Sequence, residues 1–80
     1  MINVGLLLSG CGFYDGTDVA EAVLSALALE RAGARAVYVS PEVDQMHTVD
    51  HLTGSEVEGE RRNVASESAR LARGRLKSLD

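Results

Sequence analysis

The stretch S-G-C-G-F-Y-D-G, residues Ser9 to Gly16, decides how this chain folds. It follows the apolar run I-N-V-G-L-L-L at Ile2 to Leu8, which is typical of a strand buried on both faces. After the stretch, Thr17 or Asp18 can cap a helix that runs to about Ala32. The pattern therefore predicts a glycine-rich turn that joins a first strand to a first helix.

A second strand is predicted at Ala34 to Ser40, where A-R-A-V-Y-V-S stops at Pro41, the single proline. Gly33 stands where a helix end favours a residue with positive φ. Because a helix separates the two strands, a tight hairpin is excluded and a parallel pair is expected. Leucine, valine and alanine cover most of that helix, so we expect it to be largely buried.

The remaining chain is less regular. Residues 42 to 61 are polar and weakly periodic, which predicts an irregular connection about twenty residues long. A second helix is expected from Asn63 to about Arg73, with Gly74 after it, and the tail from Arg75 is either another strand or a frayed end. The predicted fold class is α/β, with a parallel sheet in the order β-α-β-loop-α.

Length and charge restrict the classes of function. The 80 residues carry a formal net charge of -4 and are 45% apolar, so the chain holds at most one folded domain. A parallel sheet needs helices on both faces, and so small a chain suggests a portion of a larger domain. The acidic balance offers no basic stripe, so nucleic acid is not an expected partner. The longest apolar run is too short to span a membrane, and no membrane partner is expected.

Cys11 is the only cysteine, which rules out a disulfide within the chain and favours a reducing compartment. The first residues contain no positively charged leader. A cytoplasmic location is therefore expected, or the interior of an organelle if a presequence has been removed.

The turn contains the candidate binding residues Gly10, Cys11, Gly12 and Asp15. Its glycines form G-x-G-x-x-x-G, one residue longer than the dinucleotide fingerprint. Their backbone N–H groups could approach an anion at the helix N-terminus, or the glycines could serve only a sharp turn. Cys11 before a helix could be a thiolate, although a free cysteine is more often a small buried apolar residue.

Glu21 is the candidate catalytic residue. A carboxylate in the first turn of this helix faces the crevice where α/β proteins bind ligands, and it could act as a general acid or base. The spacing D-x-x-E from Asp18 to Glu21 also nearly matches a capping box, in which the glutamate is purely structural. The residues alone favour the capping interpretation.

No metal site is predicted. His47 and His51 are four residues apart with Asp50 between them, but their segment is not convincingly helical and no third ligand lies at a motif distance. Loop histidines are the simpler interpretation. The cluster Arg61-Arg62-Asn63 is most simply a helix start with Asn63 as its cap, and a substrate-binding arginine is the lesser alternative.

Four short motifs in register resemble the ElbB family of glyoxalase-like proteins, which belongs to the PfpI and parkinsonism-associated deglycase superfamily. These motifs are S-G-C-G-F-Y-D-G (9 to 16), E-A-V-L (21 to 24), D-H-L-T-G (50 to 54) and R-N-V (62 to 64). The resemblance runs from Ile2 to about Arg75. It implies a partial flavodoxin-like three-layer sandwich of the class I glutamine amidotransferase-like fold, and usually a homodimer.

The resemblance also implies a division of labour in the site. In the family, a cysteine on a later nucleophile elbow attacks the substrate, and the glutamate that Glu21 matches helps to transfer protons. Cys11 matches a different family cysteine, in the first turn, so the nucleophile is expected beyond this chain. A complete family domain has about 200 residues, so residues 1–80 are expected to be its N-terminal portion.

The function expected from the resemblance is a glyoxalase that needs no cofactor and acts on small dicarbonyls such as methylglyoxal, with the 80-residue chain inactive alone. One alternative is a small-molecule or nucleotide-binding module that uses the glycine turn. A second is a truncated pseudo-enzyme that pairs its open sheet edge with a partner or a second copy.

Overall fold

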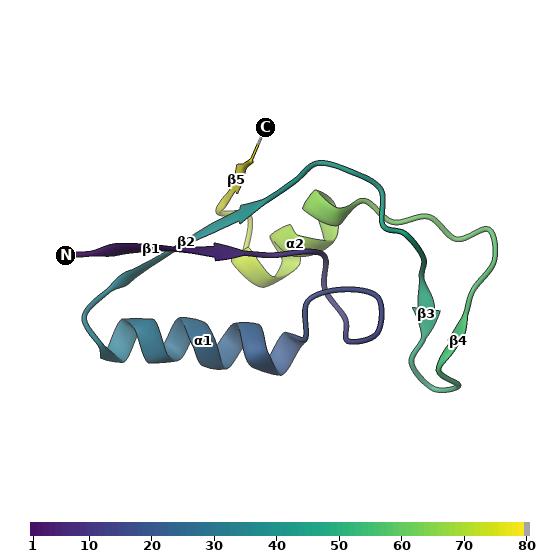
Figure 1. Ribbon diagram of the computed structural model, residues 1–80, viewed down its shortest axis with the longest axis horizontal. Coiled ribbons are helices and arrows are strands. Elements are labelled where there is room, and N and C mark those ends of the chain that lie inside the picture. Colours follow the sequence, from purple (N-terminus) through teal and green to yellow (C-terminus); the bar gives the residue numbers. More distant parts are fainter. Residues whose placement is uncertain (80) are drawn as a thin grey trace.

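A three-stranded parallel sheet forms the centre of the molecule. The computed structural model describes residues 1–79, and its strands are paired in the order β1-β2-β5. A separate antiparallel pair, β3 and β4, lies at the end of the molecule where the turn after β1 also lies (Figure 1). The elements are β1 (Asn3–Leu7), α1 (Val19–Arg31), β2 (Arg35–Ser40), β3 (Val49–Asp50), β4 (Ser55–Glu56), α2 (Val64–Ala72) and β5 (Leu76–Ser78).

The β1-α1-β2 unit confirms the prediction from the glycine turn. β1 pairs with β2 in parallel, with Leu6 opposite Tyr38, and α1 begins after Asp18 and ends before Gly33, whose φ is +80°. The tail is a strand, because β5 pairs in parallel with β2 and places Leu76 beside Tyr38. The predicted parallel α/β class is therefore confirmed.

Both helices lie on the same face of the sheet. Leu8, Ala22 and Ala72 form the buried cluster, and Tyr38 and Leu76 pack against it. In the order β1-β2-β5, the connections from β1 to β2 and from β2 to β5 run in the same direction across the sheet. Because such connections are right-handed, both helices are placed on the same face. The described residues thus supply the sheet and one helical layer of the three-layer sandwich.

Two burial predictions are wrong for the same reason. β1 is not buried on both faces, since the Leu7 side chain points to the uncovered face and is 64% exposed. α1 is not largely buried either, because Val23 is 56% and Leu24 is 62% exposed and Ala22 is the helix's buried residue. Among residues 1–79, no element packs on the outer side of α1 or on the second face of the sheet.

The segment from 42 to 61 is not wholly irregular. Val49 and Asp50 pair with Glu56 and Ser55 in a short hairpin, and Gly54 in its turn has a φ of +77°. Two-residue strands leave no alternation to detect in the sequence. The hairpin is held instead by a contact with the glycine turn, which is 34 residues earlier.

Candidate functional site

The glycine turn is closed by its own backbone and side chains. The Ser9 N–H donates to Thr17 Oγ1 (2.7 Å), the Thr17 N–H donates to Ser9 O (3.1 Å), and the Gly12 N–H donates to Thr17 O (2.9 Å). The Val19 N–H at the start of α1 donates to Gly12 O (3.3 Å). These bonds fix the turn at the carboxyl end of β1, where α/β proteins bind ligands.

The same bonds weigh against a phosphate cradle. An anion site needs several backbone N–H groups that point outward together. Here the N–H groups of Ser9, Gly10 and Gly12 all donate inside the protein, and that of Gly10 donates to the buried Ser68 Oγ (2.8 Å). The arrangement favours turn formation as the role of the glycines over dinucleotide binding.

Two glycines in the turn are required by geometry. Gly10 has a backbone φ of +85°, which residues with a side chain rarely adopt, and a Cβ there would lie 2.8 Å from Gln45 Oε1. A Cβ on Gly16 would lie 2.9 Å from Cys11 N and 3.1 Å from Ser9 O. At Gly16 the obstacle is backbone, which cannot rotate away.

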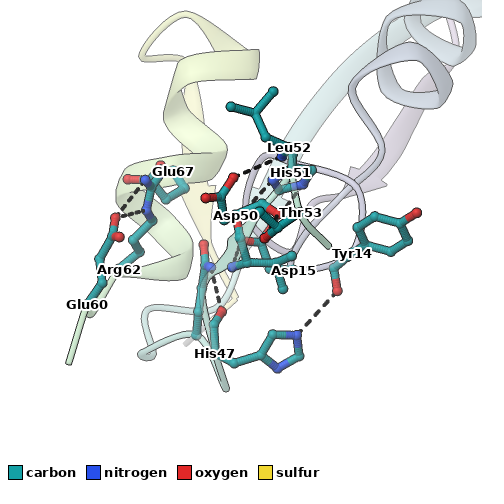
Figure 2. A network of polar contacts seen from close by, with 12 residues as sticks. Tyr14, Asp15, His47, Asp50, His51, Leu52, Thr53, Glu60, Arg62 and Glu67 are labelled. Atoms are coloured by element: carbon teal, nitrogen blue, oxygen red, sulfur yellow. Dashed lines mark hydrogen bonds and ion pairs between the residues drawn. The ribbon is translucent and has the colours of Figure 1, made fainter. Parts of the chain in front are cut away.

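Asp15 connects the turn to the β3–β4 hairpin. Its side chain is only 6% exposed, and Oδ2 accepts a hydrogen bond from the Val49 N–H (2.7 Å). Oδ1 lies 3.4 Å from His51 Nε2, and the His51 ring stacks on Tyr14 with centroids 5.9 Å apart (Figure 2). The carboxylate that the sequence placed among the substrate-binding residues is engaged with the protein itself.

Glu21 occupies the third position of α1. Its N–H donates to Asp18 Oδ1 (3.1 Å), so Asp18 is the N-cap and the first half of the predicted capping box is present. The reciprocal half is missing: the Glu21 carboxylate is exposed and has no hydrogen-bond or ion-pair partner among residues 1–79. Capping therefore accounts for the Glu21 backbone and leaves its side chain without a structural role.

Cys11 is half-buried within the turn and its thiol is free. Beside the turn, an open groove of about 420 Å³ is lined by Asp15, Gly16 and Thr17 from one side and by residues 43 to 47 from the other. Among the predicted site residues, Asp15 reaches this groove; the lining does not include Gly10, Cys11, Gly12 or Glu21.

The two histidines lie on either side of the turn. His47 Nε2 is 3.3 Å from the Tyr14 carbonyl oxygen, and His51 faces Asp15 (Figure 2). Their contacts hold loops together. In the part of the chain that the structure describes, no three histidine, cysteine, aspartate or glutamate side chains gather where they could hold a metal ion.

The basic cluster before α2 is structural. Asn63 caps α2 through its side chain, which accepts from the Ser66 N–H (2.9 Å), as predicted. Arg62 donates to Glu60 Oε1 (2.7 Å) and to Glu67 Oε1 (3.2 Å). The hydrogen bond and the charge of Glu60 raise the pKa of Arg62 above its ordinary value, with a smaller contribution from Glu67.

Ser68 was missed as part of the site. It is fully buried, and its hydroxyl accepts the Gly10 N–H from across the fold. The signal was available in the spacing, since Val64, Ser68 and Ala72 are four residues apart and form the buried stripe of α2. A serine in such a stripe must find a hydrogen-bond partner.

Comparisons with known proteins give consistent matches over nearly the whole chain. It is 51% identical over 77 residues (96% of this chain) to the human glutamine amidotransferase-like class 1 domain-containing protein 3, mitochondrial, and 50% identical to the rat ES1 protein homolog, mitochondrial. The zebrafish ES1 protein, mitochondrial, is 40% identical over 72 residues. The chain spans 29% of the human and rat relatives and 27% of the zebrafish relative. No protein-family model matches it.

A solved structure shares the fold. The crystal structure of an isoprenoid biosynthesis protein with an amidotransferase-like domain from Ehrlichia chaffeensis superposes with a TM-score of 0.93 at 40% sequence identity. That match covers 98% of this chain and 36% of the Ehrlichia protein.

Sheet order, glycine turn and matches together define a class I glutamine amidotransferase-like α/β protein. Over the part of their length that it spans, the chain is a homologue of the ES1 proteins and of the ElbB-like isoprenoid biosynthesis protein, which confirms the resemblance seen in its motifs.

The relatives overturn one prediction. A cytoplasmic location was expected from the sequence, but the three curated relatives are all named as mitochondrial proteins, so that expectation is contradicted. The motifs of the folded chain do not carry this information, because a protein's location is set by targeting segments and not by its fold. No helix in residues 1–79 has the length and apolar character needed to cross a membrane.

Proposed function

We propose that this chain forms one wall of the active site of an ElbB-type glyoxalase, in which Glu21 transfers protons. The observation that carries the proposal is the Glu21 carboxylate: it follows a rigid turn at the carboxyl end of β1 and has no partner within residues 1–79. A carboxylate with no structural contact, held on a helix at the ligand-binding edge of a parallel sheet, is available for chemistry.

The reaction requires proton transfer and no external oxidant. Methylglyoxal becomes lactate when the aldehyde carbon is oxidised, the neighbouring ketone carbon is reduced, and one water is added. In the proposed route a thiolate attacks the aldehyde to give a hemithioacetal, and a base moves the C1 proton to C2 through an enediol. The resulting thioester is hydrolysed by water, which frees the thiol and yields lactate.

The groups of this chain divide that work. Glu21 is the proton carrier between C1 and C2 and needs no cofactor to act. The backbone of Gly10, Cys11 and Gly12 forms the wall that positions Glu21, through the bond from the Val19 N–H to Gly12 O. The attacking thiolate comes from a cysteine outside these 80 residues, and the substrate is a small dicarbonyl.

A chimera tests the proposal. This chain replaces the matching segment of the Ehrlichia protein, to which it is 40% identical, and lactate formation from methylglyoxal is measured. Glu21→Gln should lower kcat by roughly 100-fold or more, as expected for loss of a general acid–base group. Glu30→Gln, in the last turn of the same helix, is the matched control and should leave kcat unchanged.

Two results would refute the proposal. One is a folded chimera that makes lactate at the same rate with Glu21→Gln as with Glu30→Gln. The other is a chimera and a parent Ehrlichia protein that both leave methylglyoxal unconverted at enzyme concentrations that exceed the substrate.

A further inference from the structure

We propose that Asp15 and His51 form a latch that holds the glycine turn against the β3–β4 hairpin. In this latch Asp15 is a positioning residue that does not contact substrate, and His51 is the partner of Asp15. The functional consequence rests on the proposed function above, whereas the structural latch is independent of it.

The contacts of Asp15 account for both carboxylate oxygens. Oδ2 accepts the Val49 N–H at 2.7 Å, at the start of β3. Oδ1 has essentially no exposed surface and makes no hydrogen bond within residues 1–79, and the His51 ring, whose Nε2 is 3.4 Å away, is the nearby group that can donate to it. A buried carboxylate oxygen needs a donor, and no ligand can reach an atom that the protein covers. His51 is therefore the group placed to satisfy it.

The His51 ring faces one acceptor with each nitrogen. Nδ1 is 3.0 Å from Val49 O and Nε2 faces Asp15 Oδ1. A neutral imidazole carries one N–H and can donate to one of these acceptors, whereas the imidazolium donates to both. The Tyr14 ring stacks against the His51 ring. Asp15 and Tyr14 thus contact the ring from the turn (Figure 2), and Val49 contacts it from the hairpin.

Gly12 leaves the space that the latch needs. A Cβ on Gly12 would collide with Asp15 Oδ1 and would come within 3.4 Å of His51 Nε2. The second glycine of the turn is therefore explained by the latch. Because Gly12 O also accepts the Val19 N–H, the latch adjoins the bond that sets the start of α1 and hence the place of Glu21.

An asparagine at position 15 separates positioning from charge. In Asp15→Asn the amide oxygen can still accept the Val49 N–H, and the amide NH₂ can donate to Nε2 of a neutral His51 whose Nδ1–H donates to Val49 O. In Asp15→Ala both contacts are lost. A latch is consequently preserved in the first variant and broken in the second.

Amide hydrogen exchange of the 80-residue chain measures the latch without any activity assay. The Val49 amide should lose protection about tenfold or more in Asp15→Ala and stay within about threefold of wild type in Asp15→Asn. The Glu58→Ala control removes an exposed carboxylate just after β4 and should leave Val49 protection unchanged. Gly12→Ala should resemble Asp15→Ala.

A double-mutant comparison tests the pairing itself. His51→Ala should lower Val49 protection, and adding it to Asp15→Ala should cause no further loss, since coupled partners are not additive. Full additivity, or an unchanged Val49 amide in Asp15→Ala, would overturn the latch. The Leu8 amide, which donates to Val39 O in the sheet, reports on global unfolding. If Asp15→Ala also loses protection at Leu8, that variant is unfolded, and the Val49 protection of His51→Ala and Asp15→Asn then tests the latch.

The chimera extends the test to function. Asp15→Asn should keep kcat and KM near wild type, because the position of the turn is kept. A carboxylate that bound substrate directly would instead give a raised KM in Asp15→Asn with normal Val49 protection, and this result would refute the positioning role. A chimera without glyoxalase activity would refute the proposed function and leave the exchange test of the latch standing.

Discussion

At Gly16 a side chain would be obstructed by backbone, because a Cβ would meet the backbone of Ser9, Gly10 and Cys11. We predict that Gly16→Ala lowers the free energy of unfolding by about 1–3 kcal/mol, the usual cost of forcing atoms into a packed site. Urea denaturation measures it. Gly5→Ala is the control: nothing lies within 4 Å of a Cβ there, so this strand variant should be neutral or slightly stabilising, and equal losses for both would contradict the turn geometry.

Arg62 gives a prediction about pH. Its raised pKa means that its ion pairs stabilise the fold across the neutral and mildly alkaline range and are lost as pH rises through the arginine range. The side chain is 41% exposed, so Arg62→Gln should cost only about 0.2–1 kcal/mol. The loss should be the same at pH 6 and pH 9 in urea titrations, and a loss confined to one of these pH values would count against this explanation.

Residues that act locally were predictable from the sequence, and those that act across the fold were not. Asn63 was identified as a cap, and Asp18 as one of two candidates with Thr17, because capping depends on a spacing of three residues. The Asp15–Val49 bond and the Gly10–Ser68 bond join residues 34 and 58 apart, and no local pattern encodes such a pair. The roles assigned to Glu21 and to the substrate-binding residues of the turn stay predictions.

The start of α1 controls where Glu21 lies, so the cap is the element to perturb. Asp18→Ala removes the acceptor of the Glu21 N–H and should lower stability by about 1 kcal/mol, within the range measured for N-caps. Asp18→Asn keeps an acceptor oxygen and should lose little. Thermal unfolding followed by circular dichroism checks both, and a loss as large in the asparagine variant would show that charge and not capping is responsible.

Among the elements, those with caps and glycine ends were placed to within about a residue. α2 was expected from Asn63 to Arg73 and spans Val64–Ala72, where Arg73 takes a left-handed conformation with φ +56° before Gly74. The β3–β4 hairpin was missed because its strands have two residues each and are held from outside. The burial of α1 was overestimated, because composition shows that a helix face is apolar but does not show whether another element covers that face.

The chain exposes more surface to solvent than is expected for a compact monomer of its mass. It exposes 5697 Å², about 1,000 Å² more than a compact monomer of 8.5 kDa is expected to expose. It measures 44 × 27 × 15 Å, and Figure 1 looks along the shortest of these three dimensions. An excess of this size is comparable to one side of a standard protein interface.

Neighbouring leucines test the one-sided packing. Leu8 is 2% exposed in the cluster under the helices, whereas Leu7 points to the open face. Leu8→Ala should cost about 2–5 kcal/mol, as for other buried leucines, and Leu7→Ala should cost less than about 0.5 kcal/mol. Urea denaturation compares them under the same conditions. Similar losses would mean that the open face is covered in solution.

The proposed activity depends most on Glu21, and its most direct measurement is the rate of lactate formation from methylglyoxal by the chimera and by the 80-residue chain. We predict that the chimera is active, that Glu21→Gln lowers its kcat by roughly 100-fold or more while Glu30→Gln does not, and that the 80-residue chain alone is inactive. An 80-residue chain that makes lactate at an enzymatic rate would contradict the need for a distant cysteine. A Glu21→Gln chimera with the kcat of the Glu30→Gln control would contradict the role of Glu21.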